Sequence, residues 1–450
     1  MIPKAKPAAY FSGCNEALLD AVPTSAKSIL EVGCGEGNLG ARLLANDRQR
    51  AVFGVERDAE VAKRAGRRLT KVFTLDVESS EVPLPDCTLD CIIYGDVLEH
   101  LIDPEGVIRR HRRLLKPGGS ILCSVPNVQH HSVIAAILRG DFQYQQMGIL
   151  DATHLRFFTY ATFIKLLLDT GYSPALVQAE LPPCPADFLD AASPLLQRFG
   201  LHPGRTGRYL GTYQYLFRGT PYTGFDEAAN EPEEPLSFVV CANDQQTLTD
   251  CLLSSPCLAP GSPHEVLPIW GCASAADGLN QGLLQAKNPI VVFVHQDVYL
   301  PEGWPRRFLQ QYRQAERLGP LGVVGVFGVT PNGWAGRVVD REQMLVQGER
   351  LPAVVETLDE VLLAMPKDTP LRFDPNLGFH FYGSDICVAA QQRGLLNVAV
   401  DAPCFHHSRT VDGALPLAFN LSAALFAQKW RERLPIATTC AIVAADGLYQ

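Results

Sequence analysis

The sequence has 450 residues, about three times the ~150 residues of a typical domain, so it should form two or three cores. Hydrophobic residues make up 47% of the chain and charged residues 19%, a balance that is typical of globular proteins and excludes a largely disordered chain. The 39 Lys and Arg residues against 48 Asp and Glu residues leave a formal net charge of -9, so the chain lacks the basic excess that drives binding to a phosphate backbone. We therefore expect a globular protein of several domains with no nucleic-acid partner.

The 13 cysteines are spread along the chain, and no two have the two-residue separation of a typical zinc or dithiol site. The first residues of the sequence also lack the apolar core of a signal peptide. Both features predict reduced thiols and a cytoplasmic location.

The longest apolar runs, such as 289–294 and 415–427, are shorter than the ~20 residues that span a bilayer, so we predict no transmembrane segment. The stretch 415–434 combines an apolar body with a basic end. Two interpretations are open for it: packing on its own domain, or peripheral contact with an anionic membrane at its inner face.

Short apolar runs alternate with helical stretches along the first half of the chain. The strand candidates are 28–32, 51–55, 71–75, 89–94 and 120–125. This alternation predicts parallel strands joined by crossover helices, and therefore a doubly wound α/β sheet. Two further candidates, 174–179 and 209–217, would complete the sheet with an antiparallel pair.

The segment 219–235 (GTPYTGFDEAANEPEEP) is acidic and rich in Gly and Pro, with almost no large aliphatic side chain to bury. We interpret it as a linker between a domain at 1–218 and a domain at 236–450. The second half then restarts the alternation, which predicts another layered α/β domain. Its strand candidates are 237–241, 265–270, 289–294 and 322–330.

The sharpest motif of the first half is ILEVGCGEG, which leads from a strand through Gly33, Gly35 and Gly37 into a helix starting near Asn38. Glycines let the turn approach a ligand, and the helix N-terminus behind it supplies unpaired N–H groups. Glu56 closes the next strand, where a carboxylate can accept from both hydroxyls of a ribose. This context predicts nucleoside binding, with a merely tight structural turn as the alternative.

Further segments make the resemblance specific. They are VFGVE, LDV at 75–77, DVLEHLIDP at 96–104, LLKPGG at 114–119 and SVPNVQHHS at 124–132. Together with the glycine turn they resemble class I S-adenosylmethionine-dependent methyltransferases from about residue 10 to 217. The resemblance implies a Rossmann-like sheet with S-adenosyl-L-methionine as cofactor. The residues it assigns to the cofactor are Tyr10, Glu31, Gly33, Gly35, Gly37, Glu56, Asp76 and Asp96.

Methyl transfer needs a base only if the acceptor must lose a proton. His100 lies just after Asp96, and His154 belongs to GILDATHLRFFT, a run that resembles a segment of methyltransferases associated with bacterial surface-glycan synthesis. We predict His100 and His154 as the catalytic candidates. For each of them a hydrogen-bonded structural imidazole is the alternative.

In the second half, the apolar strand at 289–294 ends in His295, Gln296 and Asp297. A carboxylate at the end of a strand can bind a hard divalent cation that bridges a diphosphate. Many strands end in Asp, so this pattern alone leaves a structural interpretation open.

Three further segments, ADGLNQGLLQA (276–286), GFHFYGSDICVAAQQRG (378–394) and CFHHS (404–408), resemble family-2-like glycosyltransferases with the A-type fold over about 236–409. The resemblance implies a nucleotide-sugar donor and Mn2+ or Mg2+. It gives Asp297 the place of the last acid of the metal motif, with His295 where that motif has its first acid.

The same resemblance assigns the other residues of this half. His406 or His407 would be a further metal ligand, and Asn243 and Asp244 would hold the nucleotide. Asp385 in FYGSD would be the base that deprotonates an acceptor hydroxyl, or alternatively a cap of the helix that follows.

Taken together, the two resemblances predict a bifunctional methyltransferase and glycosyltransferase that acts on a bacterial-type surface glycan or its lipid-linked precursor. One rival is a methyltransferase whose C-terminal domain is catalytically inactive and only binds glycan, an interpretation that His295 keeps open. Another rival is a methyltransferase for a small molecule or a protein.

Overall fold

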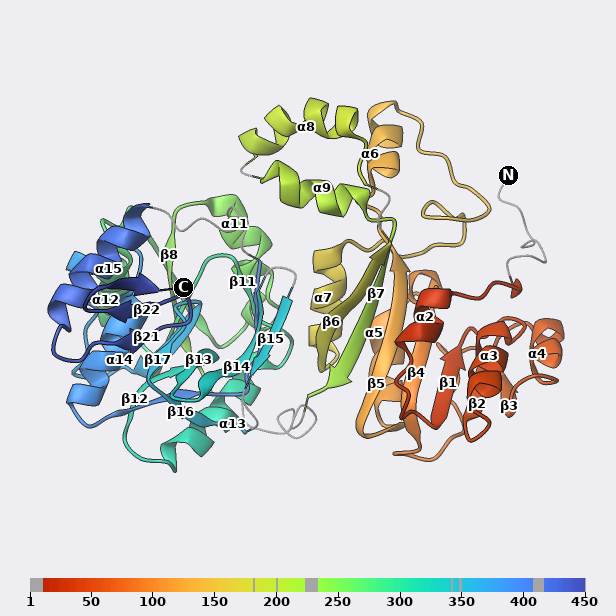
Figure 1. Cartoon of the computed structure of the whole chain (residues 1–450), viewed down its shortest axis with the longest axis horizontal. Helices are drawn as coiled ribbons and strands as arrows, with labels where there is room; N and C mark the ends of the chain where they lie inside the picture. Colours follow the sequence, from red (N-terminus) through yellow and green to blue (C-terminus); the bar gives the residue numbers. More distant parts are fainter. Residues whose placement is uncertain are drawn as a thin grey trace. The chain divides into compact units, whose positions relative to one another are not determined.

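The computed structural model describes residues 11–180, 183–199, 201–222, 234–340, 343–347, 350–407 and 417–449. The chain divides into two compact units, Met1–Thr223 and Gly224–Gln450. Figure 1 labels the helices and strands of both units.

The first unit is built on a seven-stranded sheet in the order β3-β2-β1-β4-β5-β7-β6. The five strands from β3 to β5 are parallel, and β7 lies antiparallel to both β5 and β6. This confirms the predicted doubly wound sheet with an antiparallel last pair. The strand bounds are β1 Ser28–Val32, β2 Ala51–Glu56, β3 Lys71–Thr74, β4 Leu89–Gly95, β5 Leu115–Pro126, β6 Tyr172–Glu180 and β7 Gln214–Pro221.

Helices cover both faces of this sheet, with α3 on one face and α5 and α7 on the other (Figure 1). Local signals set where they begin: the Asp58 side chain accepts from the N–H groups of Glu60 and Val61 at the start of α4. The helix bounds are α2 Glu16–Ala21, α3 Asn38–Asn46, α4 Ala59–Ala65, η1 Leu98–His100, α5 Pro104–Arg112, α6 His131–Leu138, α7 Tyr160–Asp169, α8 Ala186–Arg198 and α9 Pro203–Gly211.

Two differences from the sequence-based expectations concern β7. The strand expected at 209–217 starts later, because Pro203 and the His202 cap begin helix α9, which runs to Gly211. At its other end β7 continues past residue 218 to Pro221, and Tyr222 after it is 3% exposed. The sheet therefore extends into the segment expected as linker, of which 223–233 lies outside the described residues.

The helices α6, α8 and α9 lie together beyond the end of the sheet where β5 finishes (Figure 1). The His131 ring joins them, since its Nδ1 lies 3.0 Å from the Leu210 carbonyl oxygen and its ring packs on Phe188. This small cap is therefore built at the carboxyl edge of the parallel strands, where ligands bind in such sheets.

The second unit has a seven-stranded sheet in the order β16-β19-β12-β18-β10-β8-β9, and a second sheet in which β11, β20, β14, β13 and β17 follow one another and β15 pairs with β14. The strand bounds are β8 Ser237–Ala242, β9 Glu265–Trp270, β10 Ile290–Val294, β11 Val298–Tyr299, β12 Leu321–Gly325, β13 Phe327–Thr330, β14 Gly333–Asp340, β15 Gln343–Gln347, β16 Ala353–Val355, β17 Thr357–Leu358, β18 Leu362–Pro366, β19 Leu396–Ala399 and β20 Phe405–His406. This layered α/β architecture agrees with the predicted fold class.

Helices flank the larger sheet and apolar side chains fill the space between them, which gives it a core on each face. The helix bounds are α11 Gln245–Asp250, η2 Leu252–Ser254, η3 Pro256–Leu258, α12 Ala275–Gln285, α13 Trp304–Glu316, η4 Pro375–Leu377, α14 Tyr382–Gln392 and α15 Leu417–Lys429.

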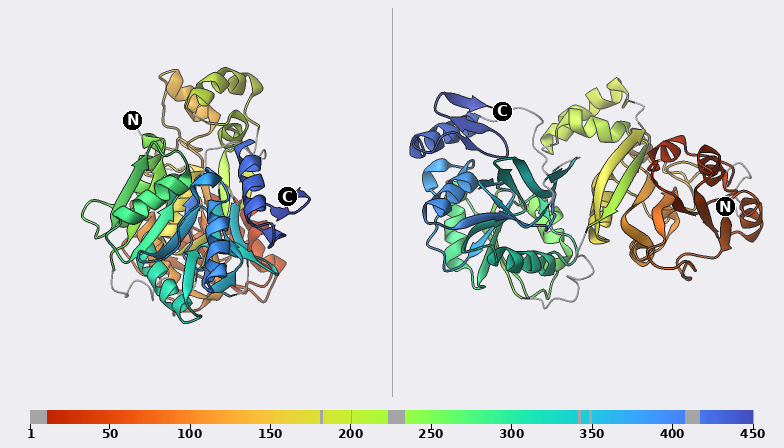
Figure 2. Two further views of the ribbon diagram at one scale, coloured as in Figure 1. Left: turned by 90° about the vertical axis from the view of Figure 1, so that its left-hand side faces the viewer. Right: turned by 60° about the horizontal axis from the view of Figure 1, so that its bottom comes forward.

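The C-terminal part of the second unit forms its own small cluster, in which α15 packs on the short strands β21 (Ile436–Ala437), β22 (Ile442–Ala444) and β23 (Gly447–Tyr449) (Figure 2). Phe426 and Trp430 are buried there with Val443. Among the helices of the described residues, none is long and apolar enough to span a bilayer.

Candidate functional site

The glycine turn of the first unit connects β1 to α3. Gly33, Gly35 and Gly37 have φ angles of 67°, 52° and 76°, the left-handed region that favours glycine. A Cβ added to Gly33 would lie 2.4 Å from a Val97 methyl carbon, and one added to Gly35 would lie 2.7 Å from the Phe11 carbonyl oxygen. The turn therefore needs glycine for its own backbone and for close packing, whether or not a ligand is bound.

Glu56 closes β2 directly beside this turn. Its Oε2 accepts from the Gly35 N–H at 3.1 Å, and its Oε1 accepts from the Asp58 N–H at 2.9 Å. Each carboxylate oxygen has two lone pairs, so one acceptor position on each remains beyond these contacts. Two adjacent acceptor oxygens match the two hydroxyls of a ribose.

Glu31 supports the turn from below. The side chain is 7% exposed, and its Oε2 accepts from the Gly40 N–H in the first turn of α3 at 3.1 Å. Burial raises the pKa of this carboxyl to about 8, and the Gly40 hydrogen bond opposes the shift.

The two aspartates assigned to the cofactor follow the neighbouring strands. Asp76, half-buried, comes after β3 and accepts from the Glu78 N–H at 2.9 Å. Asp96 follows β4 with a φ of 53°, is exposed, and accepts from Ser124 Oγ and from the Gln214 side-chain amide. A non-glycine residue in this region is uncommon, and such strain gathers at functional sites. Tyr10, also assigned to the cofactor, lies outside the described residues.

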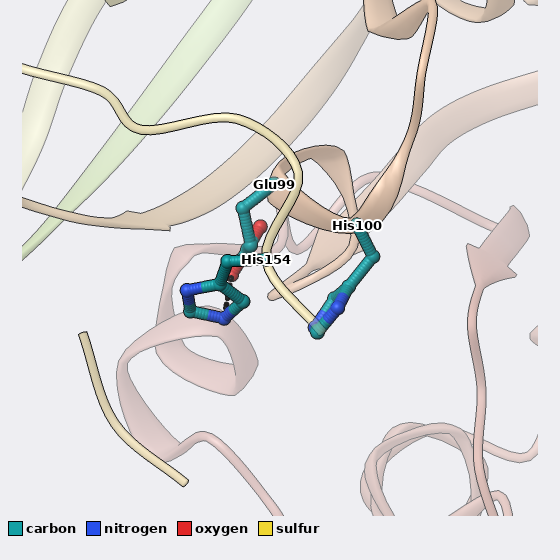
Figure 3. A group of neighbouring side chains, drawn as sticks. All are labelled: Glu99, His100 and His154. Carbon is teal, nitrogen blue, oxygen red and sulfur yellow. Dashed lines mark ion pairs between the residues drawn. The ribbon is translucent and has the colours of Figure 1, made fainter. Parts of the chain in front are cut away.

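The two predicted catalytic histidines of the first unit, His100 and His154, lie together although they are far apart in sequence. The ring centroids of His100 and His154 are 4.8 Å apart, and Glu99 lies beside both (Figure 3). Burial raises the pKa of Glu99 well above its usual range, and the negative charges of Asp96 and Asp151 add to the shift.

In the second unit, His295 and Asp297 follow β10, and His406 ends β20. The ligand atoms of these three residues all lie within 4.8 Å of one another. His406 Nε2 is 3.4 Å from Asp297 Oδ1, and His295 Nδ1 is 4.0 Å from the same oxygen. The pairing of β11 with β20 brings them together, since Val298 is opposite His406.

Two carboxylates surround His406. Burial alone would lower the pKa of His406, but Asp297 and Asp340 raise it to about 10. Burial would likewise raise the pKa of Asp297, yet His406 and His295 hold it below its usual range. Asp340 Oδ1 is 2.7 Å from His406 Nδ1, so a carboxylate orients the ring in the way that it orients metal-binding histidines.

Asn243, Asp244 and His407, which were also assigned to the second site, are not members of the cluster formed by His295, Asp297 and His406. Asn243 and Asp244 follow β8, and the Gln296 side chain accepts from both of their N–H groups. Asp244 caps α11 by accepting from the Thr247 N–H at 3.1 Å. His407 donates its backbone N–H to the Asp297 carbonyl oxygen, and its ring stacks on Phe405. The cluster of three ligand atoms contains His406 and not His407.

Asp385 lies in the first turn of α14 and is 1% exposed. Its Oδ1 accepts from Trp430 Nε1 at 2.8 Å, and Lys429 Nζ lies 2.7 Å from the same oxygen. Burial raises the pKa of Asp385, and Lys429 opposes the shift. Its contacts thus tie α14 to the end of α15.

Sequence reasoning did not name several residues that the structure places at these sites. Glu99 could have been found, because it directly precedes His100 and follows Asp96 at the spacing of one helical turn. Asp340 and Tyr382 could not have been found from their spacing in the sequence. Tyr382 Oη, for example, is 2.9 Å from His295 Nε2, a contact that depends on strand order and helix placement.

Comparisons with known proteins give a separate family match for each half of the chain. A family model described as a methyltransferase domain matches residues 8–177, and one described as a glycosyltransferase-like family matches residues 237–413. The chain is 35% identical over 148 residues to a probable S-adenosylmethionine-dependent methyltransferase of Mycobacterium tuberculosis, which covers 33% of this chain and 49% of that protein.

A similar protein of Mycolicibacterium smegmatis is 38% identical over 101 residues, covering 22% of this chain and 38% of that protein. The match thus spans half or less of these curated relatives. A solved S-adenosylmethionine-dependent methyltransferase of Archaeoglobus fulgidus aligns with a TM-score of 0.34 and 16% identity, over 47% of this chain and 96% of that one.

The methyltransferase match contains the glycine turn, Glu56 and the Glu99 cluster, and the glycosyltransferase-like match contains the histidines and aspartate that follow β10 and β20. The chain therefore joins a region that matches a methyltransferase domain to a region that matches the glycosyltransferase-like family.

Proposed function

We propose that the chain is a bifunctional transferase. Its first domain would methylate, and its second would transfer a sugar from a nucleotide-sugar donor with the help of Mn2+ or Mg2+. The acceptor would be a bacterial-type surface glycan or its lipid-linked precursor. The observation that carries the proposal is that each unit places a suitable set of polar groups at the carboxyl ends of its central parallel strands.

The first domain fits S-adenosyl-L-methionine through its own groups. Glu56 has acceptor capacity for the ribose hydroxyls, Glu31 supports the turn, and Asp76 follows the neighbouring strand for the adenine. The cofactor supplies an electrophilic methyl group when bound. The protein's task is then to hold the acceptor in line, and Asp96, His100 and His154 lie on the segments that would do so.

Removal of Glu56 tests the methyltransferase half. Glu56→Ala should weaken binding of S-adenosylhomocysteine about tenfold to a hundredfold, because a charge-assisted hydrogen bond contributes about 1.5–3 kcal/mol. Glu60→Ala, which removes an exposed carboxylate on α4, should bind like the wild type. Calorimetry that finds equal affinity in all three proteins would exclude this pocket as the cofactor site.

The second domain fits a divalent cation through His295, Asp297 and His406, two imidazoles and a carboxylate with close ligand atoms. A cation there would neutralise the charge of a leaving diphosphate. Asn243 and Asp244 lie at the end of β8, which is parallel to β10, so they are placed to hold the nucleotide. Asp385 remains the proposed base for the acceptor hydroxyl, although Lys429 and Trp430 hold its carboxylate.

One observation favours the rival in which the second domain only binds glycan. His406 lies between two carboxylates, and its raised pKa favours a cationic ring that already offsets part of their charge. A metal ion would have to displace that proton. The rival therefore predicts a stable ion cluster with no metal affinity at neutral pH.

Metal-dependent nucleotide binding decides between an active glycosyltransferase domain and the rival that only binds glycan. The wild type should bind a preferred nucleoside diphosphate with Mn2+ and lose that binding on chelation. Asp297→Asn should weaken it, whereas Asp385→Asn should leave it intact and lower sugar transfer by about 10²–10⁴. If no nucleoside diphosphate binds with Mn2+ or Mg2+, the glycan-binding rival holds and the methyltransferase assignment is unaffected.

A cytoplasmic location belongs to the same proposal, with peripheral contact at the inner face of the membrane if the acceptor is lipid-linked. Buried free cysteines such as Cys34, Cys123 and Cys387 suit a reducing compartment.

A further inference from the structure

The cluster of Glu99, His100 and His154 in the methyltransferase domain has features of a ligand site that a pair of catalytic histidines does not need. Glu99 and His100 end the short η1 helix after β4, and His154 comes from the loop before α7. Figure 3 shows the three side chains converging from these two segments. One ligand atom of each residue lies within 4.8 Å of the others.

The loop fixes the tautomer of both rings. His154 Nδ1 is 3.0 Å from the Ile149 carbonyl oxygen, and His100 Nδ1 is 3.2 Å from the Thr153 carbonyl oxygen. A carbonyl can only accept, so each Nδ1 carries the proton, and Nε2 is the ring nitrogen that can serve as a metal ligand. Histidines that bind metals are held in this way, with the second ring nitrogen donating to a backbone carbonyl or a carboxylate.

The loop that carries His154 is itself anchored to η1. The Glu99 carbonyl oxygen accepts from the N–H groups of Leu155 at 2.7 Å and Arg156 at 3.0 Å. Asp151, which is 2% exposed, accepts from the N–H and the hydroxyl of Thr153. The three candidate ligands therefore sit on backbone that is held in place from both sides.

Glu99 supplies the second, independent observation. Its side chain is 1% exposed, and within the described part of the chain its Oε2 has no hydrogen-bond partner. Its Oε1 is 3.9 Å from His154 Nε2, which is longer than a hydrogen bond. A buried carboxyl oxygen without a partner is costly, and a cation between the carboxylate and the two rings would remove that cost.

We propose that Glu99, His100 and His154 bind a divalent transition-metal ion. One carboxylate and two imidazoles are borderline N/O donors, which suit Zn2+ or Mn2+ better than Ca2+. This site is separate from the one around Asp297 in the other domain. What the ion does rests on the proposed methyltransferase function: it would hold an acceptor oxygen beside Asp96 and favour its deprotonation.

The binding test uses the full chain with the second domain's ligands disabled. In an Asp297→Asn/His406→Asn background, titration with Mn2+, and separately with Zn2+, should show one bound ion by calorimetry, and the Mn2+ complex should give a bound-state electron paramagnetic resonance signal. Adding Glu99→Gln or His154→Asn should weaken binding at least about tenfold. Adding Glu105→Gln, which removes an exposed carboxylate on α5, should leave it unchanged.

Binding of S-adenosylhomocysteine to the same proteins separates the proposed metal site from the proposed methyltransferase function. If the background takes up neither ion, or if Glu99→Gln and His154→Asn bind as tightly as the background, the metal site is refuted, whatever the cofactor result. If the ion binds and the cofactor does not, the metal site stands and the methyltransferase role fails. Should Glu99→Gln not fold by circular dichroism, His100→Asn, at a less buried position, gives the same decision.

Discussion

Two carboxylates on adjacent strands have different tasks because their surroundings differ. Glu56 accepts from two backbone N–H groups at the edge of the glycine turn, whereas Glu31 is buried beneath α3 and accepts from the Gly40 N–H. Burial disfavours the charged form and outweighs this hydrogen bond, so the Glu31 carboxyl keeps its proton to higher pH.

Glu31→Gln should therefore change the pH dependence of stability. In the wild type the folded state binds this proton more tightly than the unfolded chain, so the free energy of unfolding falls as pH rises from 4.5 to about 8. The slope is at most about 1.4 kcal/mol per pH unit. The glutamine side chain keeps an acceptor for the Gly40 N–H and has no proton to lose. The free energy of unfolding of the Glu31→Gln variant, taken from denaturation curves, should therefore change less between pH 5.5 and 8 than that of the wild type. Equal slopes in both proteins would contradict the burial argument.

Asp385 combines a proposed catalytic role with a structural one, and the two can be separated. Lys429→Met should lower the free energy of unfolding by about 1.5 kcal/mol, because it leaves a buried carboxylate without its charged partner. The value is at the low end of such effects because the Lys429 side chain is 35% exposed. Arg431→Met, at a side chain 78% exposed, should have almost no effect in the same urea titration.

If Lys429→Met is as stable as Arg431→Met, the ion pair does not hold α14 to α15, and the Asp385 carboxylate is available for chemistry. A loss of stability in both would instead indicate a general effect of charge.

At the scale of single elements, α12 lies close to β8 because two of its residues are glycine. A Cβ on Gly278 would lie 2.4 Å from Cys272 Sγ, and one on Gly282 would lie 2.1 Å from a Val239 methyl carbon. Gly278 and Gly282 are four residues apart and so share the face toward the sheet. The ADGLNQGLLQA motif therefore encodes close helix packing as well as a family resemblance.

Gly282→Ala should destabilise the second unit by about 1–3 kcal/mol through overpacking, even though alanine favours a helix by about 1 kcal/mol over glycine. Gln281→Ala, at the exposed neighbouring position, should stay within about 0.5 kcal/mol of the wild type. Thermal unfolding measures both. A Gly282→Ala protein as stable as the wild type would show that α12 can move away from β8 without cost.

The elements of the central sheets could be predicted because strand burial and helix starts are local signals. The apolar runs of β1, β4 and β10 and the glycine turn before Asn38 fall where the sequence placed them. The start of β7 was predicted too early. The His202 cap is a weak sequence signal for the start of a helix, and a buried leucine such as Leu210 is equally compatible with a strand. Asp340 was missed because only the parallel register of β14 with β20 brings it to His406.

At the scale of the whole molecule, the two compact units each contain their own sheet and core, which predicts that each folds alone. Contacts made by residues 219–222 place the end of the first unit more closely than the amino-acid composition of the segment 219–235 could. Gly219 pairs with Ile121 of β5, and Tyr222 Oη donates to the Leu168 carbonyl oxygen at 2.9 Å. A fragment ending at residue 218 would lose these contacts.

A fragment of residues 1–223 should therefore be soluble and bind S-adenosylhomocysteine like the full chain. A fragment of residues 1–218 should unfold at a temperature about 6–12 °C lower, since loss of a buried aromatic side chain costs about 3 kcal/mol and each kcal/mol shifts the midpoint of a domain this size by about 2–4 °C.

Tyr222→Phe in the longer fragment is the matched control for this comparison. It removes only the hydrogen bond to Leu168 and keeps the buried ring, so it should cost about 0.5–1.5 kcal/mol, less than the truncation. Differential scanning calorimetry of the three fragments gives the order directly. If residues 1–218 and 1–223 melt at the same temperature, the contacts of β7 beyond residue 218 do not stabilise the sheet, and the domain ends where the acidic, Gly- and Pro-rich composition begins.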